Sequence, residues 1–367
     1  MRDLRLKELA KNLIEYSTEL KAGDKILIEA IGKTEDLALE LIEKVYATGG
    51  IPFLYLENPR LEAALIREAS DEHFRMRREW EELRMAKMDA YVGIRCSENP
   101  YLAKNVPNDR QEQKMKLLWE PVHGKIRVPK TNWVILRYPN DSMAQQAAMP
   151  TEEFEDFYFR VCNLDYGRMS KRMEPLVDLM NQTDRVEIKG PGTDLSFSIK
   201  DIPAIKCDGK RNIPDGEVFT APVRDSINGV ISYNAPSPNQ GFVFKDIVLT
   251  FKDGKIIDGK ANDTQRLNAL LDTDEGARYV GEFAFGLNPE IKDPMGDILF
   301  DEKIAGSIHL TPGACYEEAP NGNHSATHWD LVLCQTPAYG GGEIYFDGKL
   351  IRKDGFFTLD ALQPLNP

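Results

Sequence analysis

The chain has 367 residues, of which 42% are hydrophobic and 29% are charged, and its net charge is −13. Because a domain typically takes about 100–200 residues, this length predicts two domains, and the composition is that of a folded globular protein. The negative charge argues against nucleic acid or an anionic membrane as the main partner, since a phosphate backbone needs a basic footprint. The sequence contains no run of about 18 apolar residues, so it predicts no membrane span.

The amino-terminal third alternates between strand and helix patterns. Apolar runs predict strands at 25–30, 51–56, 89–95 and 132–138, with helices between them at 34–48 and 61–88. Thr34 is the expected N-cap of the first of these helices, and Gly49 with Gly50 its stop. Strands separated in this way favour βαβ units and a mostly parallel sheet. Neither GxGxxG after the first strand nor a P-loop occurs, so a nucleotide site would lack its phosphate cradle.

A change of pattern near residue 185 divides the chain. Residues 142–182 have apolar positions at three- and four-residue spacing, which predicts helices that join the two halves. After them come short strands at 186–190, 195–199, 229–233, 243–251, 255–259 and 343–351, and one helix at 263–272. The sequence therefore predicts an α/β domain with a mostly parallel sheet and a helical linker at 1–184. A β-rich α+β domain at 185–367 follows it and is expected to carry the chemistry.

Cysteine and histidine are both scarce. The five cysteines are scattered, form no CxxC motif and are odd in number, which indicates reduced thiols in a cytoplasmic protein: Cys96, Cys162, Cys207, Cys315 and Cys334. The chain also has five histidines, and three of them, His309, His324 and His328, fall within 20 residues. This uneven placement is the first indication of a functional site.

Four segments of the second half concentrate carboxylate and imidazole side chains. They are NIPDGEVFTAP with Glu217, GEFAFGLNP with Glu282, LFDEKIAGSIHLTPGACY with Glu302, His309 and Tyr316, and NGNHSATHWDLVL with His324, His328 and Asp330. His328 and Asp330 are two residues apart, so on a strand they point to the same face. Oxygen and nitrogen ligands without thiolate suit Zn²⁺, Co²⁺ or Mn²⁺ in a catalytic site.

The number of these groups bears on how many ions they hold. Several carboxylates and two histidines exceed the needs of one tetrahedral zinc, and they suit two ions that share a carboxylate. HxD alone is a weak signal, and the single-zinc motif HExxH is absent. From the residues alone, a metal site and a set of ordinary buried salt bridges both stay open.

The same four segments, in this order, resemble the M29 family of metallo-aminopeptidases, the aminopeptidase T type. PDGEVFTAP, GEFAFG, LFDEKI, HLTPGACY and SATHWDLV carry the resemblance, which extends over nearly the whole chain. It implies an enzyme, expected to be a homodimer, that releases N-terminal amino acids from peptides with two divalent metal ions.

The resemblance also implies a role for each matching residue. The implied metal ligands are Glu217, Glu282 as the bridge between the ions, Glu302, His309, His328 and Asp330. Tyr316, seven residues after His309, is the implied catalytic tyrosine and would donate a hydrogen bond to the oxyanion. Glu217 or Glu282 would carry the proton to the leaving amine. The interval between Glu302 and His309 is two residues longer than the family pattern, and His324 matches no ligand position.

Two other functions use the same ligands. The protein could be a two-metal hydrolase of a non-peptide amide, or a non-catalytic protein that binds a ligand in the pocket. The first domain has no motif of its own and is expected to cover the site. Gly340, Gly341 and Gly342 either allow a close backbone approach near the site or form a plain turn between strands.

Overall fold

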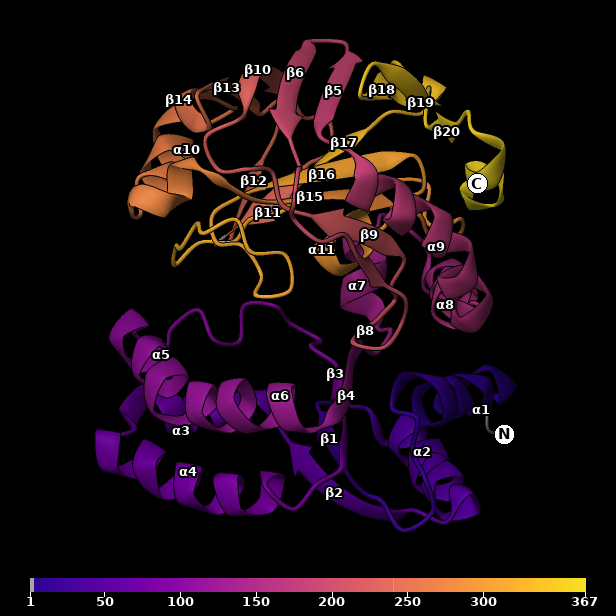
Figure 1. Cartoon of the computed structure of the whole chain (residues 1–367). Helices are drawn as coiled ribbons and strands as arrows, with labels where there is room; N and C mark the ends of the chain where they lie inside the picture. The colour runs from indigo at the N-terminus through magenta and orange to yellow at the C-terminus, as the bar shows by residue number, and fades with distance from the viewer. Residues whose placement is uncertain (1–2, 240) are drawn as a thin grey trace. The chain divides into compact units, whose positions relative to one another are not determined.

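The computed structural model describes residues 3–239 and 241–367, and the chain forms two compact units (Figure 1). Unit 1 comprises Met1–Leu164 and Gly209–Ile213, and unit 2 comprises Asp165–Asp208 and Pro214–Pro367. The predicted boundary at residue 185 lies inside unit 2. Helix α9 (Tyr166–Gln182), expected in the linker, belongs to unit 2 because it contacts strands of that unit.

Unit 1 is built on a parallel sheet, as the sequence predicts. Its strand order is β2-β1-β3-β4-β8, and every neighbouring pair is parallel. The bounds are β1 Lys25–Ile31, β2 Ile51–Glu57, β3 Ala90–Arg95, β4 Asn132–Arg137 and β8 Asn212–Ile213. The first four strands were expected, whereas β8 is added when the chain returns briefly to this unit.

Helices occupy most of the rest of unit 1. They are α1 Leu4–Lys11, α2 Glu35–Thr48, α3 Pro59–Glu68, α4 Asp71–Met85, α5 Asn108–Lys114, α6 Val128–Lys130, α7 Asp141–Gln146 and α8 Thr151–Cys162, with π-helical turns η1 Asn12–Ser17 and η2 Met115–Arg127. Helix α2 follows Thr34 and ends at Gly49 with φ +83°, the left-handed cap that glycine favours. The segment expected to be helical at 61–88 forms two helices, and the Ser70 hydroxyl accepts a hydrogen bond from the His73 N–H and caps α4.

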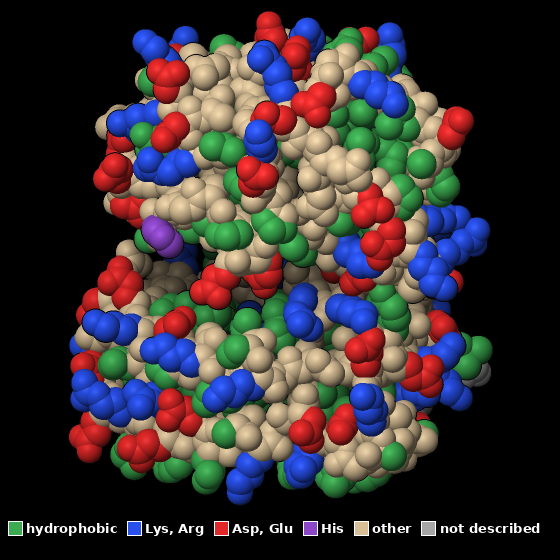
Figure 2. Space-filling view, in the orientation of Figure 1, with side chains coloured by type: hydrophobic (Ala, Val, Ile, Leu, Met, Phe, Trp, Pro, Cys, Tyr) green, Lys and Arg blue, Asp and Glu red, His purple; other side chains and the backbone are tan. Residues whose placement is uncertain are grey.

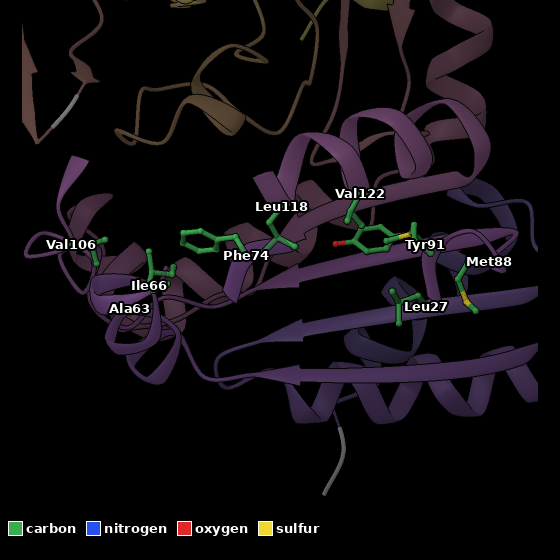
Figure 3. Packing of buried hydrophobic residues seen from close by; sticks show 11 residues of the cluster. Leu27, Ala63, Ile66, Phe74, Met88, Tyr91, Val106, Leu118 and Val122 are labelled. Atoms are coloured by element: carbon green, nitrogen blue, oxygen red, sulfur yellow. The ribbon is translucent and has the colours of Figure 1, made fainter. Parts of the chain in front are cut away.

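One face of the parallel sheet is covered by α3, α4 and η2. Figure 3 shows the buried side chains of this core, among them Leu27 of β1, Tyr91 of β3, Phe74 of α4 and Leu118 of η2. Leu27 and Tyr91 are partners in the register, so they lie side by side on this face. Burial of such apolar side chains contributes about 1.5–3 kcal/mol each.

Unit 2 contains an eight-stranded and a five-stranded sheet, both antiparallel. The larger has the order β14-β13-β10-β6-β5-β18-β19-β20, with β5 Arg185–Gly190, β6 Thr193–Ser198, β10 Asn228–Ser232, β13 Val248–Lys252, β14 Lys255–Lys260, β18 Glu343–Phe346, β19 Lys349–Lys353 and β20 Phe356–Phe357. The smaller has the order β17-β16-β15-β9-β7, with β7 Ile205–Cys207, β9 Glu217–Thr220, β15 Val280–Gly286, β16 Ser307–Pro312 and β17 Leu331–Cys334.

The other elements of unit 2 are short. They are α10 Thr264–Leu271, α11 Ile298–Asp301, the 3₁₀ turns η3 Glu275–Arg278, η4 Pro337–Tyr339 and η5 Asp360–Leu365, and the hairpin of β11 Ser237–Asn239 with β12 Phe242–Phe244. The predictions of one continuous strand at 243–251 and one at 343–351 were wrong. The first segment is split between β12 and β13 at Asp246 (φ +53°), and the second between β18 and β19 at Asp347 (φ +48°), where the chain leaves the extended conformation.

Three further properties complete the description. On the face shown in Figure 2, basic and acidic side chains are interspersed. Among the described residues, no helix is long and apolar enough to cross a membrane. All five cysteines are free.

Candidate metal centre

The two faces of strand β15 separate the core of unit 2 from its polar site. All seven residues of this strand are buried. Phe283 and Phe285 point to the eight-stranded sheet, where their rings lie 5.0 Å from Phe197 and 6.0 Å from Phe346. Because side chains alternate along a strand, Glu282 projects from the opposite face. The pattern EFAF thus anchors a carboxylate in the interior, with aromatic packing behind it.

The register of the five-stranded sheet gathers further polar residues on the face of Glu282. Glu282 is the partner of Thr311 on β16, Ala284 is the partner of His309, and Gly286 is the partner of Glu217 on β9. Partners across an antiparallel pair share a face, so three segments from distant parts of the sequence meet here.

The first group of potential ligands consists of Glu217, Glu282 and His309. The His309 Nε2 atom lies 3.0 Å from Glu282 Oε1 and 3.5 Å from Glu217 Oε2. All three side chains are buried, and one ligand atom from each lies within 4.8 Å of the others. Glu217 Oε2 is a buried atom without a hydrogen-bond partner. Buried polar atoms are normally satisfied, so this oxygen indicates a missing partner such as a cation.

The second group shares Glu282 and adds His328 and Asp330. His328 Nε2 lies 3.4 Å from Glu282 Oε2 and 3.3 Å from Asp330 Oδ1. The Nδ1 of His328 lies 2.9 Å from the carbonyl oxygen of Ala314, and the Thr311 hydroxyl donates to Asp330 Oδ1 at 2.7 Å. A histidine whose Nδ1–H is held by a carbonyl presents Nε2 to a metal. Nε2 is buried and otherwise lacks a hydrogen bond.

The position of the second group differs from the sequence expectation in one respect. His328 and Asp330 lie just before β17, which begins at Leu331. His328 forms only an isolated bridge with Gly313. The two side chains nevertheless approach each other as the two-residue spacing predicts, with His328 Nε2 3.3 Å from Asp330 Oδ1.

The pKa values in this cluster follow from its excess of carboxylates. Burial lowers the pKa of His309, but the hydrogen bond to Glu282 and the charge of Glu217 raise it to about 9. Burial also opposes protonation of His328, yet Asp330 and Glu282 raise its pKa to about 11. Protonated imidazoles thus compensate the buried negative charge, which divalent cations would do instead when bound.

A buried lysine adjoins the first group. Lys303 is fully buried, and its Nζ lies 2.7 Å from Glu217 Oε1, 2.6 Å from Glu302 Oε1 and 3.7 Å from Asp215 Oδ1. Burial raises the pKa of Glu302 to about 8 although Lys303 opposes the rise. Lys303 therefore lies between Glu302 and Glu217. Glu302 belongs to neither group of potential ligands, so its role as a metal ligand stays a prediction.

Tyr316 lies at the open side of the cluster. Its ring centroid is 4.7 Å from that of His328 and 5.5 Å from that of Phe219, and the residue is 47% exposed. A cavity of about 190 Å³ also borders His328 and Asp330, and its other lining residues include Ser237, Ile298, Trp329 and Val332. A tyrosine hydroxyl and a partly apolar cavity thus adjoin the same ligands.

A histidine and a glycine turn singled out in the sequence lie outside this cluster. His324 is exposed and belongs to none of the ligand groups found among the described residues. Gly340 and Gly341 form a turn with φ values of +94° and +72°. A Cβ atom on Gly341 would lie 2.2 Å from Asp354 Oδ1, so the glycines serve a tight turn.

The comparison with known proteins is decisive for the family. The profile of the thermophilic metalloprotease family M29 matches residues 2–344. The chain belongs to the M29 family. Aminopeptidase T of Thermus aquaticus is 27% identical over 94% of this chain and 94% of its own length, and aminopeptidase 2 of Geobacillus stearothermophilus is 26% identical over 95% and 94%.

A solved structure supports the fold of this M29 protein. Wild-type AmpT from Thermus thermophilus superposes with a TM-score of 0.81 at 23% identity, covering 97% of this chain and 99% of its own. The predicted family, fold class and enzyme class are therefore confirmed. The residue roles stay predictions. Sequence analysis assigned no role to Lys303, Asp215 and Thr311, although they lie in the segments that carry the resemblance, because only the fold shows that they contact the site.

Proposed function

We propose that the protein is an aminopeptidase that removes N-terminal amino acids from peptides with two divalent ions, Zn²⁺, Co²⁺ or Mn²⁺. The supporting observation is that Glu282 belongs to both groups of three ligands, one completed by Glu217 and His309, the other by His328 and Asp330. A shared carboxylate between two groups of oxygen and nitrogen ligands is the arrangement expected for a pair of ions.

The chain's own residues would perform distinct tasks around the bound peptide. When bound, the ions would activate a water molecule and polarise the scissile carbonyl. Tyr316 would donate a hydrogen bond from its O–H to the developing oxyanion, a role that suits a neutral donor on a partly exposed side chain. Glu217 or Glu282 would accept a proton and pass it to the leaving amine. The excess of carboxylates would also attract the free α-amino group, which favours exopeptidase over endopeptidase action.

The adjoining cavity would receive the side chain of the residue that is removed. It borders the second ligand group, and Ile298, Trp329 and Val332 give it apolar walls. Pockets of this kind combine apolar walls with a few polar groups that orient the ligand. We therefore propose a preference for apolar N-terminal residues.

A cytoplasmic location and a homodimer are also part of the proposal. Five free thiols suit a reducing compartment. Subunit association rests on the family resemblance, and sedimentation of the purified protein measures it.

Substitution of Glu282 tests the central observation. Glu282→Gln keeps the shape of the side chain but removes the shared negative charge, so both ions and peptide turnover are expected to be lost. Bound metal is measured by elemental analysis after dialysis, and turnover with leucine p-nitroanilide. Glu187→Gln on β5 is the matched control. A Glu282→Gln enzyme with two ions and full turnover would refute the shared-ligand model.

Substrate chemistry separates the alternative functions. An aminopeptidase cleaves leucine p-nitroanilide but not its N-acetyl derivative, because it needs the free amine. A hydrolase of other amides would accept the acetylated compound equally, and a ligand-binding protein would turn over neither.

A further inference from the structure

The fully buried Lys303 is unusual because it has three carboxylate neighbours and lies beside the first ligand group. We infer that Lys303 is a positioning residue: its ammonium group occupies the place of a third cation and fixes Glu217 so that one oxygen alone faces the metal position. This inference rests on the proposed two-ion function. It assigns a task to a residue outside the predicted ligand set.

The backbone holds Lys303 firmly at this position. The Lys303 N–H donates to the carbonyl of Phe300 at 3.0 Å, and the Lys303 carbonyl accepts from the Asn288 N–H at 2.9 Å. The Asn288 side chain in turn donates to the carbonyl of Asp215 at 2.9 Å. Three loops that lie apart in the sequence are thus tied together around the ammonium, and its direction is set by the fold.

The ammonium distinguishes the two oxygens of Glu217. Oε1 lies 2.7 Å from Lys303 Nζ, whereas Oε2 lies 3.5 Å from His309 Nε2 and is buried without a hydrogen-bond partner. The contact at Oε1 is an ion pair without hydrogen-bond geometry, and its attraction restrains the direction of the carboxylate. Oε2 is therefore directed to the metal position as a single ligand atom.

Charge balance supports the same role. The cluster brings five carboxylates into a buried setting: Asp215, Glu217, Glu282, Glu302 and Asp330. Two divalent ions would offset part of this negative charge, and the Lys303 ammonium offsets a further part beside Asp215, Glu217 and Glu302. Cys207, Asp215 and Glu217 form a further group with metal-like spacing, but Lys303 Nζ lies against two of its members. Uncompensated buried charge is costly, so the lysine serves as the third cation.

The test measures the affinity of each metal equivalent, because an activity assay alone does not separate the two ions. Purified wild type is stripped of metal and titrated with Co²⁺, with affinities from calorimetry and ligand environment from the visible absorption of each bound ion. Lys303→Met keeps the length of the side chain without the charge. Loss of a side chain that orients a metal ligand costs about 10–100-fold in affinity. We expect that loss for one Co²⁺ equivalent, with the other unchanged.

Matched variants keep the result interpretable. Lys303→Arg retains the charge and should weaken that equivalent less than Lys303→Met does. If Lys303→Met does not fold, its combination with Asp215→Asn removes one buried carboxylate and restores the charge balance, while Glu217 still lacks its anchor. Exposed Lys349→Met on β19 is the control for general effects of losing a lysine.

Each outcome bears on one proposal. Selective weakening of one equivalent in Lys303→Met or in the double variant supports the positioning role. Unchanged affinity for both ions, or equal weakening of both, overturns it. Failure of the wild type to bind two equivalents would overturn the proposed two-ion function instead, and this is seen before any variant is measured.

Discussion

The hydroxyl of Thr311 offers a sharp test of how the second ligand group is held. Thr311 is fully buried opposite Glu282, and its Oγ1 donates to Asp330 Oδ1 at 2.7 Å. Thr311→Val keeps the shape of the side chain and removes only this donor. A hydrogen bond to a charged group contributes about 1.5–3 kcal/mol, so the metal-free protein should lose stability of that order.

The effect on metal affinity should be smaller than the hydrogen-bond energy. The bond exists with and without metal, so most of its energy cancels in binding, and only the orientation of Asp330 is lost. We expect the lower end of the range for such supporting residues, about 10-fold weaker binding of the ion held by Glu282, His328 and Asp330. The ion held by Glu217 and His309 should bind as before.

Two measurements decide the matter for Thr311. Urea denaturation in the presence of a chelator gives the stability of the metal-free protein, and Co²⁺ titration gives the two affinities. Thr250→Val on β13, in the other sheet, is the control. Unchanged stability and unchanged affinity in Thr311→Val would refute the assigned contact, and weakening of both ions would refute its restriction to one group.

Three further predictions concern catalysis, specificity and stability. Tyr316→Phe should lower kcat about 10²–10³-fold with metal content intact, because it removes one oxyanion donor; unaltered kcat excludes that role. Ile298→Phe narrows the cavity and should lower kcat/KM for leucine p-nitroanilide more than for alanine p-nitroanilide. The control Ile257→Phe on β14 should leave the ratio of these two kcat/KM values unchanged. An unchanged ratio in Ile298→Phe excludes the cavity as the pocket for the substrate side chain. Burial lowers the pKa of His123 to about 4, and its Nδ1 accepts a hydrogen bond from Arg127 Nε at 3.1 Å. The unfolded chain then binds the proton more readily, so stability falls by about 3 kcal/mol as pH drops from 7 through 4. Urea denaturation should show a shallower fall in His123→Gln, and identical pH profiles would contradict this.

The parts of the fold that were predictable are those with a local signal. β1 to β4 were found because each is a short apolar run bounded by turn residues, and α2 because Thr34 and Gly49 mark its ends. β15 and β16 were not predicted as strands. Both faces of each strand are buried, one by the apolar core and the other by the polar site, so neither has the solvent-exposed polar face of a half-buried strand. The membership of α9 was equally hidden, because it depends on which sheet the helix contacts.

Some residues of the site could be predicted from their type, whereas others belong to the site only because of tertiary packing. Five of the potential ligands could be proposed because carboxylate and imidazole side chains in the segments that carry the family resemblance are chemically distinctive. They are Glu217, Glu282, His309, His328 and Asp330. Lys303 could not, since DEK at 301–303 is the pattern of an ordinary exposed turn. Its burial depends on tertiary structure, because its carbonyl accepts a hydrogen bond from the Asn288 N–H and its ammonium lies beside Asp215 and Glu217.

Strand β15 has aromatic side chains on one face and the Glu282 carboxylate on the other, and this arrangement suits the proposed cation site. A buried strand with aromatic packing on one face gives Glu282 no access to bulk water. Several ionised carboxylates crowded there would repel one another and lose hydration, which costs several kcal/mol per ion unless compensated. Lys303 compensates only one end of the cluster, and the histidines do so only by taking up protons. Divalent ions at the two proposed ligand groups would neutralise the rest and leave the imidazoles neutral, so the burial that disfavours the metal-free site would favour metal binding.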